Sequence, residues 1–112
     1  MNKAKFDKLY EKELRRSQFT EMPSEEKWKS LERLHILSQY FMAKHYQAHF
    51  LMMVQAYHDK RPLWVMGQIF RFLLVGPAHL LGWLPEGNVG TSRAHPFKKM
   101  PLPKDIEEII KG

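Results

Sequence analysis

The chain has 112 residues, of which 44% are hydrophobic and 12% aromatic, and it contains no cysteine. This length favours a single domain, 1–112, because a second domain needs a second hydrophobic core. The lack of cysteine excludes disulfides and thiolate metal sites, and it fits the reducing cytoplasm, where we expect the protein to act. A net charge of +6 raises nucleic acid or an anionic membrane as partners. The basic residues are scattered and form no nucleic-acid motif, so specific nucleic-acid binding is not expected.

Two amphipathic helices are predicted in the first third of the chain. Apolar residues at three-to-four spacing, beginning with Phe6, indicate a helix over about 3–20. Pro23 suits the first turn of a second helix, where Glu25 and Glu26 lie near the positive end of the helix dipole. The short connection between them favours an antiparallel helical hairpin.

The helical pattern continues from Gln39 to Pro62 without a proline or glycine in between. Joined to the second helix, this segment is too long for one ordinary globular helix. We therefore expect a turn within 39–45, although no residue there marks it, and a third helix that ends near 58. Pro62 can open a fourth helix, so the sequence predicts an all-α fold of four main helices arranged as two hairpins.

The most apolar segment, 63–84, is long enough to span a membrane. Three polar residues interrupt it: Gln68, Arg71 and His79. Because a charged residue in mid-membrane costs roughly 2.5–3.5 kcal/mol, we predict instead a buried core helix over about 62–75. Gly76-Pro77 is expected to end that helix before a short turn. Membrane association through 63–84, or a dimer interface, is the alternative.

The character of the chain changes after position 84. Closely spaced prolines and glycines predict an irregular extension over 85–104, followed by a short helix over 105–110. The helical core is thus expected to comprise 1–84. The glycines at 87 and 90 do not form a phosphate loop, because no Lys-Ser or Lys-Thr pair follows them.

A set of residues spread over nearly the whole chain resembles a known family. These residues are Leu31-Glu32-Arg33, His35-Ile36-Leu37, Gln39, His45, His49, Gly67-Gln68, Arg71, Pro85, Gly87-Asn88, Gly90, Phe97 and Met100-Pro101-Leu102-Pro103. The chain resembles a family of short bacterial proteins catalogued as a domain of unknown function. The resemblance implies a compact helical protein whose first half is similar to helical-hairpin repeats, and it implies no reaction. The chain departs from the family pattern at Lys44, where many members have proline, and at Thr91–His95, where glycine and asparagine are more usual.

Histidine and methionine form a stripe through 35–53, in a segment without carboxylates. His45 and His49 lie one helical turn apart, a spacing at which two imidazoles can chelate one ion. His35 from the preceding helix can complete a three-histidine site if the two helices are antiparallel neighbours. Three imidazoles suit zinc, copper, nickel or iron, so a transition-metal site is one interpretation of the stripe.

Packing is the other interpretation of the stripe, and the one we favour. Met42 and Met52 would shift a metal site toward copper(I), but methionine commonly fills gaps in helical cores. His35 can equally be a core histidine bonded to a backbone carbonyl. The segment from His45 to His49 lacks the glutamate that serves as base in helical zinc proteases, so hydrolysis by that route is not expected. No catalytic residue is assigned, and we do not expect an enzyme.

Arg71 lies among apolar residues and therefore needs a polar partner or a path to solvent. We favour a structural bond from Arg71 to the C-terminal extension, with an anion or partner-peptide pocket lined by Gln68 and Trp64 as the alternative. Trp64 and Trp83 are candidate partner contacts, because aromatic residues are enriched in protein interfaces. The preferred function is a small noncatalytic protein that binds another protein or itself, and the alternative is a transition-metal-binding protein.

Overall fold

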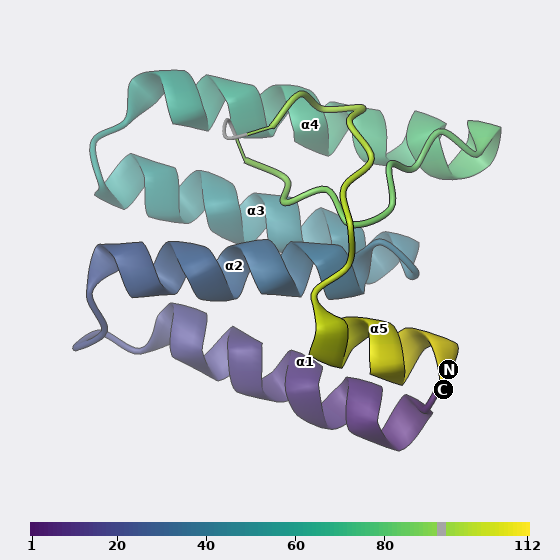
Figure 1. Cartoon of the computed structure of the whole chain (residues 1–112). Helices are drawn as coiled ribbons and strands as arrows, with labels where there is room; N and C mark the ends of the chain where they lie inside the picture. Colours follow the sequence, from purple (N-terminus) through teal and green to yellow (C-terminus); the bar gives the residue numbers. More distant parts are fainter. Residues whose placement is uncertain (92–93) are drawn as a thin grey trace.

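The computed structural model describes residues 1–91 and 94–112, and within these ranges it contains five helices and no strand (Figure 1). The helices are α1 (Lys3–Gln18), α2 (Ser24–Ser38), α3 (Met42–His58), α4 (Pro62–Leu81) and α5 (Lys104–Lys111). Helices α1 to α4 pack side by side in chain order, and α5 lies against α1 (Figure 1). The predicted all-α class is confirmed. The departure from the family pattern at 91–95 includes residues 92 and 93, which lie outside the described residues.

The helix boundaries follow from local chemistry. The side chain of Asn2 accepts a hydrogen bond from the backbone N–H of Lys5 at 3.1 Å, which caps the start of α1. Pro23 is the N-cap residue of α2, one position before the first turn in which the sequence places it. The expected break between the second and third helices lies at 39–41, inside the predicted range. Lys44 is therefore part of α3, and the turn forms without a proline at that position.

The hydrophobic core lies between α1, α2 and α3, with one residue from α5. Its largest fully buried members are Phe6, Leu31, Leu34, Leu37, Met52 and Ile106. Helix α2 is the most deeply buried element, because α1 and α3 cover it from two sides and the segment after α4 contacts it as well. Burial of these side chains removes apolar surface from water and supplies the main driving force for folding.

The prediction that the apolar segment forms a buried core helix is wrong, because most residues of α4 are not buried. Among its residues, only Gln68, Val75 and Ala78 are buried. The core is already filled by α1, α2, α3 and α5, so α4 packs mainly on α3 and leaves its most apolar face outside. By length and composition alone, α4 is the one helix in the described ranges that could cross a membrane, a test that core helices of soluble proteins also pass.

Helix α4 also continues past the point where the sequence predicts its end. It runs without interruption to Leu81 with Pro77 inside it. Gly76 precedes the proline and has no Cβ, which relieves the clash that usually excludes helical geometry before proline. Leu73, whose carbonyl loses its usual donor, is 67% exposed, so water can reach this part of the helix.

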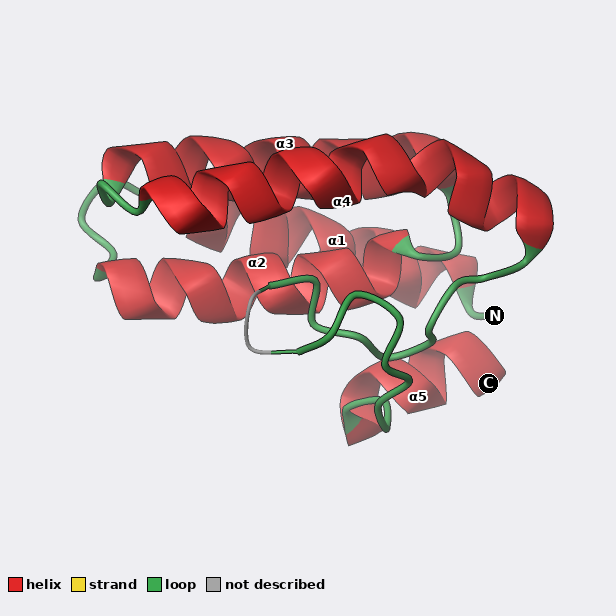
Figure 2. Cartoon of the chain, turned by 90° about the horizontal axis from the view of Figure 1, so that it is seen from above, coloured by secondary structure: helices red, strands yellow, loops and turns green. Residues whose placement is uncertain are grey.

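The segment after α4 crosses back over the helices to reach α5, and Figure 2 shows it on one side of the array. Gln39 fixes its beginning, since the side-chain amide donates to the Pro85 carbonyl at 2.9 Å and its oxygen accepts from Gly87 N–H at 3.0 Å. Gly87 has a φ of +81°, and a Cβ there would lie 2.0 Å from the Met100 carbonyl oxygen. The turn at Gly87 therefore requires glycine, and it brings the next residues onto α2.

Candidate metal centre

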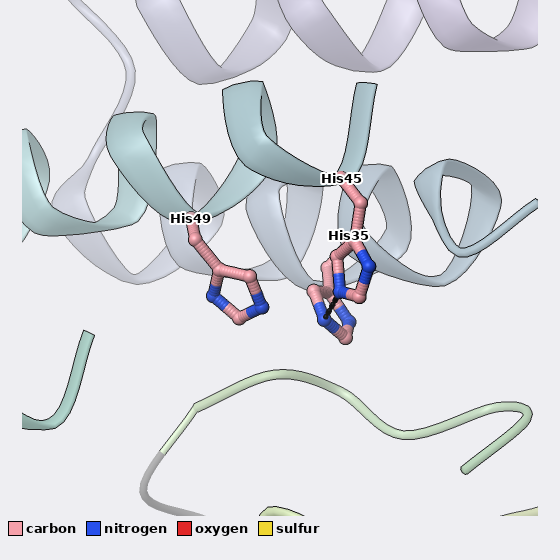
Figure 3. Close-up of side chains that lie close together, drawn as sticks. All are labelled: His35, His45 and His49. Atoms are coloured by element: carbon pink, nitrogen blue, oxygen red, sulfur yellow. Dashed lines mark hydrogen bonds between the residues drawn. The ribbon is translucent and has the colours of Figure 1, made fainter. Parts of the chain in front are cut away.

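Three histidines from two helices converge in the interior. His35 comes from the C-terminal half of α2, and His45 and His49 come from consecutive turns of α3 (Figure 3). One ring nitrogen from each lies within 4.8 Å of the others, and the Nε2 atoms of His35 and His45 are 3.0 Å apart. Tetrahedral zinc with Zn–N bonds of about 2.0–2.1 Å separates its nitrogen ligands by about 3.3 Å. The observed separations bracket this value, so small side-chain rotations can place all three nitrogens on one ion.

Burial keeps the three imidazoles neutral. Burial lowers the pKa of His45 to about 3, with further contributions from His49 and His79. It lowers the pKa of His49 to about 4, even though the hydrogen bond that His49 donates to Gln68 acts in the opposite direction. The pKa of His35 is also held well below its usual range by burial and by the other two rings. Neutral imidazole is the form that binds a metal ion, so no proton competes for these rings at neutral pH.

Hydrogen bonds from outside the cluster orient two of the rings. His35 Nδ1–H donates to the Asn88 carbonyl at 2.8 Å, which leaves Nε2 with its lone pair. His49 Nδ1–H donates to Gln68 Oε1 at 2.7 Å. The Gln68 amide nitrogen in turn donates to the Gly90 carbonyl at 2.8 Å, which fixes the amide so that its oxygen faces His49. Partners of this kind set the tautomer and the orientation of metal-binding histidines.

His45 connects the cluster to a fourth histidine. Because His35 Nε2 carries a lone pair, the 3.0 Å contact between the two rings is a hydrogen bond donated by His45 Nε2–H. His45 Nδ1 then accepts from His79 Nε2–H, also at 3.0 Å. A metal ion on His45 Nε2 would require the other neutral tautomer of His45, with its proton on Nδ1, and Nδ1–H would then donate to His79 Nε2 if the His79 proton lay on its own Nδ1. His79 on α4 thus supports both tautomers of His45.

The extension approaches the cluster more closely than any residue with a side chain would allow. Gly90 has a φ of +80°, and a Cβ at this position would lie 2.5–2.7 Å from ring atoms of His35. Glycine is therefore required both for the backbone conformation and for the contact with the imidazole. Next to it, Thr91 Oγ1 donates to the buried Glu32 carboxylate at 2.7 Å and holds the extension on α2.

A small cavity of about 40 Å³ adjoins the three histidines. Arg71 lies on its wall, and apolar side chains such as Val75 and Trp83 form much of the rest. The guanidinium donates to the carbonyl oxygens of Thr91 at 3.1 Å and Ala94 at 2.8 Å. The predicted structural bond from Arg71 to the extension is thereby confirmed.

The structure places the remaining candidate residues in different environments. Met52 is fully buried in the hydrophobic core and Met42 is exposed, and neither lines the cavity at the histidines. Gln68 is buried and supports His49 rather than facing solvent. Trp64 packs on Trp28 with ring centroids 4.9 Å apart. The structure thus brings together His35, His45 and His49 and leaves both methionines out.

Sequence reasoning did not identify Asn88 and His79 as supports of the cluster. Asn88 contributes a backbone carbonyl, and no side-chain pattern marks such a contact. His79 could have been found, because the polar residues Gln68, Arg71 and His79 of the apolar segment share one side of a helix at successive spacings of three and eight. That side is the one that faces α3 and the extension.

Taken together, the fold and the cluster define a small helical protein with a buried three-histidine centre, supported by α4 and by the extension after it. The chain belongs to the family described as "Protein of unknown function (DUF3703)", whose model matches residues 4–110. The resemblance to a family of unknown function is thus confirmed. Among curated proteins and among solved structures, none matches the chain.

Proposed function

We propose that the protein binds a divalent transition metal through His35, His45 and His49. The observation that carries this proposal is the convergence of three buried, neutral imidazoles whose ring nitrogens lie within 4.8 Å of one another. A purely structural role does not require three titratable rings in one place, because leucine or methionine fills such a volume without polar groups.

The ligand set favours zinc, copper(II) or nickel over copper(I). Imidazole nitrogen suits these divalent ions, whereas copper(I) is selected by thiolate and thioether sulfur. Met42 and Met52 lie away from the cavity, so the structure gives no support to a methionine ligand. The supporting bonds at His35 and His49 are those expected around a metal centre, because they fix which nitrogen carries the lone pair.

Elemental analysis of untagged protein from metal-replete cells tests the proposal. A double variant, His45→Ala with His49→Ala, removes two ligands. The matched control, His58→Ala with His95→Ala, removes two exposed histidines outside the cluster. We expect near-stoichiometric metal in the unchanged protein and in the control, and its loss in the cluster variant. Circular dichroism checks that all three are folded. Absence of metal from the unchanged protein, or equal metal in all three, would overturn the proposal.

A second function, self-association, is favoured by a separate observation on α4. Its outer face carries exposed apolar side chains at successive spacings of three, four, three and seven: Leu63, Met66, Phe70, Leu73 and Leu80. This is the spacing at which one helix packs along another. We propose that a second copy of the chain covers this face in an antiparallel arrangement. Lys60 and Arg61, just before α4, then lie near the negative C-terminal end of the other copy's α4.

Sedimentation over a range of concentrations tests this association. Leu73→Glu places a charge in the middle of the apolar face and is expected to give a monomer. Tyr57→Glu changes a side chain on α3 that is 74% exposed, and it serves as the control that keeps the dimer. A monomer at all concentrations, including one that binds lipid vesicles instead, would contradict self-association.

A further inference from the structure

The cavity beside the three histidines carries positive charge without a compensating acid. Arg71 is the one charged side chain among the described residues that line it. The three imidazoles line the same cavity as Arg71, so the charge of Arg71 acts on the cluster at short range. A divalent ion on the histidines would add to this positive charge. Within the described part of the chain, no carboxylate on the cavity wall offsets it.

Arg71 also has a donor that nothing in the described residues uses. One terminal nitrogen is held by two carbonyls of the extension, so the guanidinium cannot turn freely. Its Nε–H is buried and has no hydrogen-bond partner among the described residues. An unused buried donor on a cation is costly, and such groups commonly mark the place of a ligand.

The size of the cavity limits what can bind there. A cavity needs at least about 10–15 Å³ of free volume to hold one water, so about 40 Å³ has room for an anion of a few heavy atoms. A nucleotide or a sugar would need more space than this to be buried. Apolar neighbours, including Leu74, Val75 and Trp83, reduce competition from water and strengthen electrostatic interactions.

Resting on the proposed metal site, we infer that the ion bound by His35, His45 and His49 takes a small carboxylate or oxyanion as a further ligand, held on its other side by Arg71 Nε–H. Three protein ligands leave a coordination position of a tetrahedral ion open, as in zinc centres that bind water or substrate. The anion displaces water at that position and neutralises part of the charge shared by the ion and Arg71. Anion and metal should therefore strengthen each other's binding.

Cobalt(II) loading and ligand titration test this inference, because the visible spectrum of cobalt(II) reports its coordination. Metal content is measured first, and formate and formamide are then added separately. These two ligands share their size and shape, but only formate is charged. We expect formate to change the cobalt spectrum and formamide to leave it unchanged. Equal responses to both, or no response to formate by cobalt-loaded protein, would overturn the anion inference and leave the metal site intact.

Two variants locate the anion. Arg71→Met is expected to retain cobalt and to weaken formate binding by about tenfold or more, the effect of losing one charge-assisted hydrogen bond. Arg61→Met removes an arginine that stacks on Trp64 outside the cavity, and it should bind formate as the unchanged protein does. If Arg71→Met binds formate normally, the assignment of Arg71 is wrong. If the unchanged protein binds no cobalt, both the proposed function and this inference fail.

Discussion

Gly90 is the residue at which the backbone of the extension meets the histidine cluster. Gly90→Ala places a Cβ within 2.7 Å of His35 ring atoms, at a φ of +80°. We expect a loss of at least about 2 kcal/mol in the free energy of unfolding, from backbone strain and overpacking together. Urea unfolding measures this loss.

Gly82→Ala separates the two causes. Gly82 has a similar φ of +70°, but a Cβ there meets nothing within 4 Å. This variant should lose only about 1 kcal/mol, from the left-handed conformation alone. Equal losses of unfolding free energy in the two variants would show that the contact of the Cβ with His35 does not destabilise the protein.

Gln68 provides a test of how the cluster is oriented. Gln68→Met keeps a similar volume but removes the acceptor for His49 and the donor to the Gly90 carbonyl. We expect zinc affinity to fall by about 10- to 100-fold, the usual effect of losing a hydrogen bond that orients a metal ligand. Gln47→Met, which loses a bond to the Tyr10 hydroxyl outside the site, is the control. Competition with a chromophoric chelator gives both affinities.

At this scale the sequence predicts the spacing of the candidate ligands but not their supports. His45 and His49 face one way because a helix places them there, and this follows from their separation alone. The position of His35 depends on how α2 packs on α3. The bonds at Asn88 and Gly90 depend on the path of the extension, because their backbone carbonyls are the acceptors. The identities of the side chains do not predict that path.

At the scale of elements, Asp59 joins the end of α3 to the start of α2. Its carboxylate accepts from Ser24 Oγ at 2.5 Å, Trp28 Nε1 at 2.7 Å and Gln55 Nε2 at 3.0 Å. Burial alone would raise the pKa of Asp59, but these bonds and the charge of Arg61 lower it below its usual value. The folded carboxyl group therefore binds a proton less readily than the unfolded one.

This difference predicts a pH dependence of stability. The contribution of Asp59 is complete above its unfolded pKa of about 4 and is lost as the pH falls through its folded value. Asp59→Asn should cost about 1 kcal/mol at neutral pH, and the gap from the unchanged protein should begin to narrow near pH 4 and close as the pH falls through the lower folded pKa. Asp7→Asn, at an exposed ion pair with Lys3, should change little at any pH. A gap that persists in acid would contradict this role of Asp59.

The sequence of this chain predicts where the helices begin and end better than it predicts which helix faces are buried. Pro62 opens α4, because proline suits the first helical turn, and Pro23 lies just before the first residue of α2. The apolar content of α4 predicts a buried helix, yet the structure shows its apolar face outside. The hydrophobicity of a helix indicates that its apolar face can be buried. Whether the core of the same chain buries that face depends on how much of the core the other helices already fill.

At the scale of the whole molecule, the histidine cluster lies where α2, α3, α4 and the extension meet. A metal ion bound there would oppose any opening that separates these elements. With free zinc at 100 times its dissociation constant, such an opening costs about 2.7 kcal/mol more, which slows amide exchange about 100-fold. The amides of Gly87 and Gly90 report on the extension, because they donate to the side chains of Gln39 and Asn88.

Hydrogen exchange with and without zinc is therefore expected to show a localised response. Exchange of the Gly87 and Gly90 amides should slow strongly, because the extension around them is bonded to the cluster. The Asn88 carbonyl accepts from His35, and the Gly90 carbonyl accepts from Gln68. Amides in the last turn of α1 can fray without separating α2, α3, α4 and the extension, so their exchange should slow much less. The His45→Ala, His49→Ala variant should show no slowing anywhere. Equal slowing in that variant would mean that zinc stabilises the protein from another place, and the architecture around the three histidines would then serve packing alone.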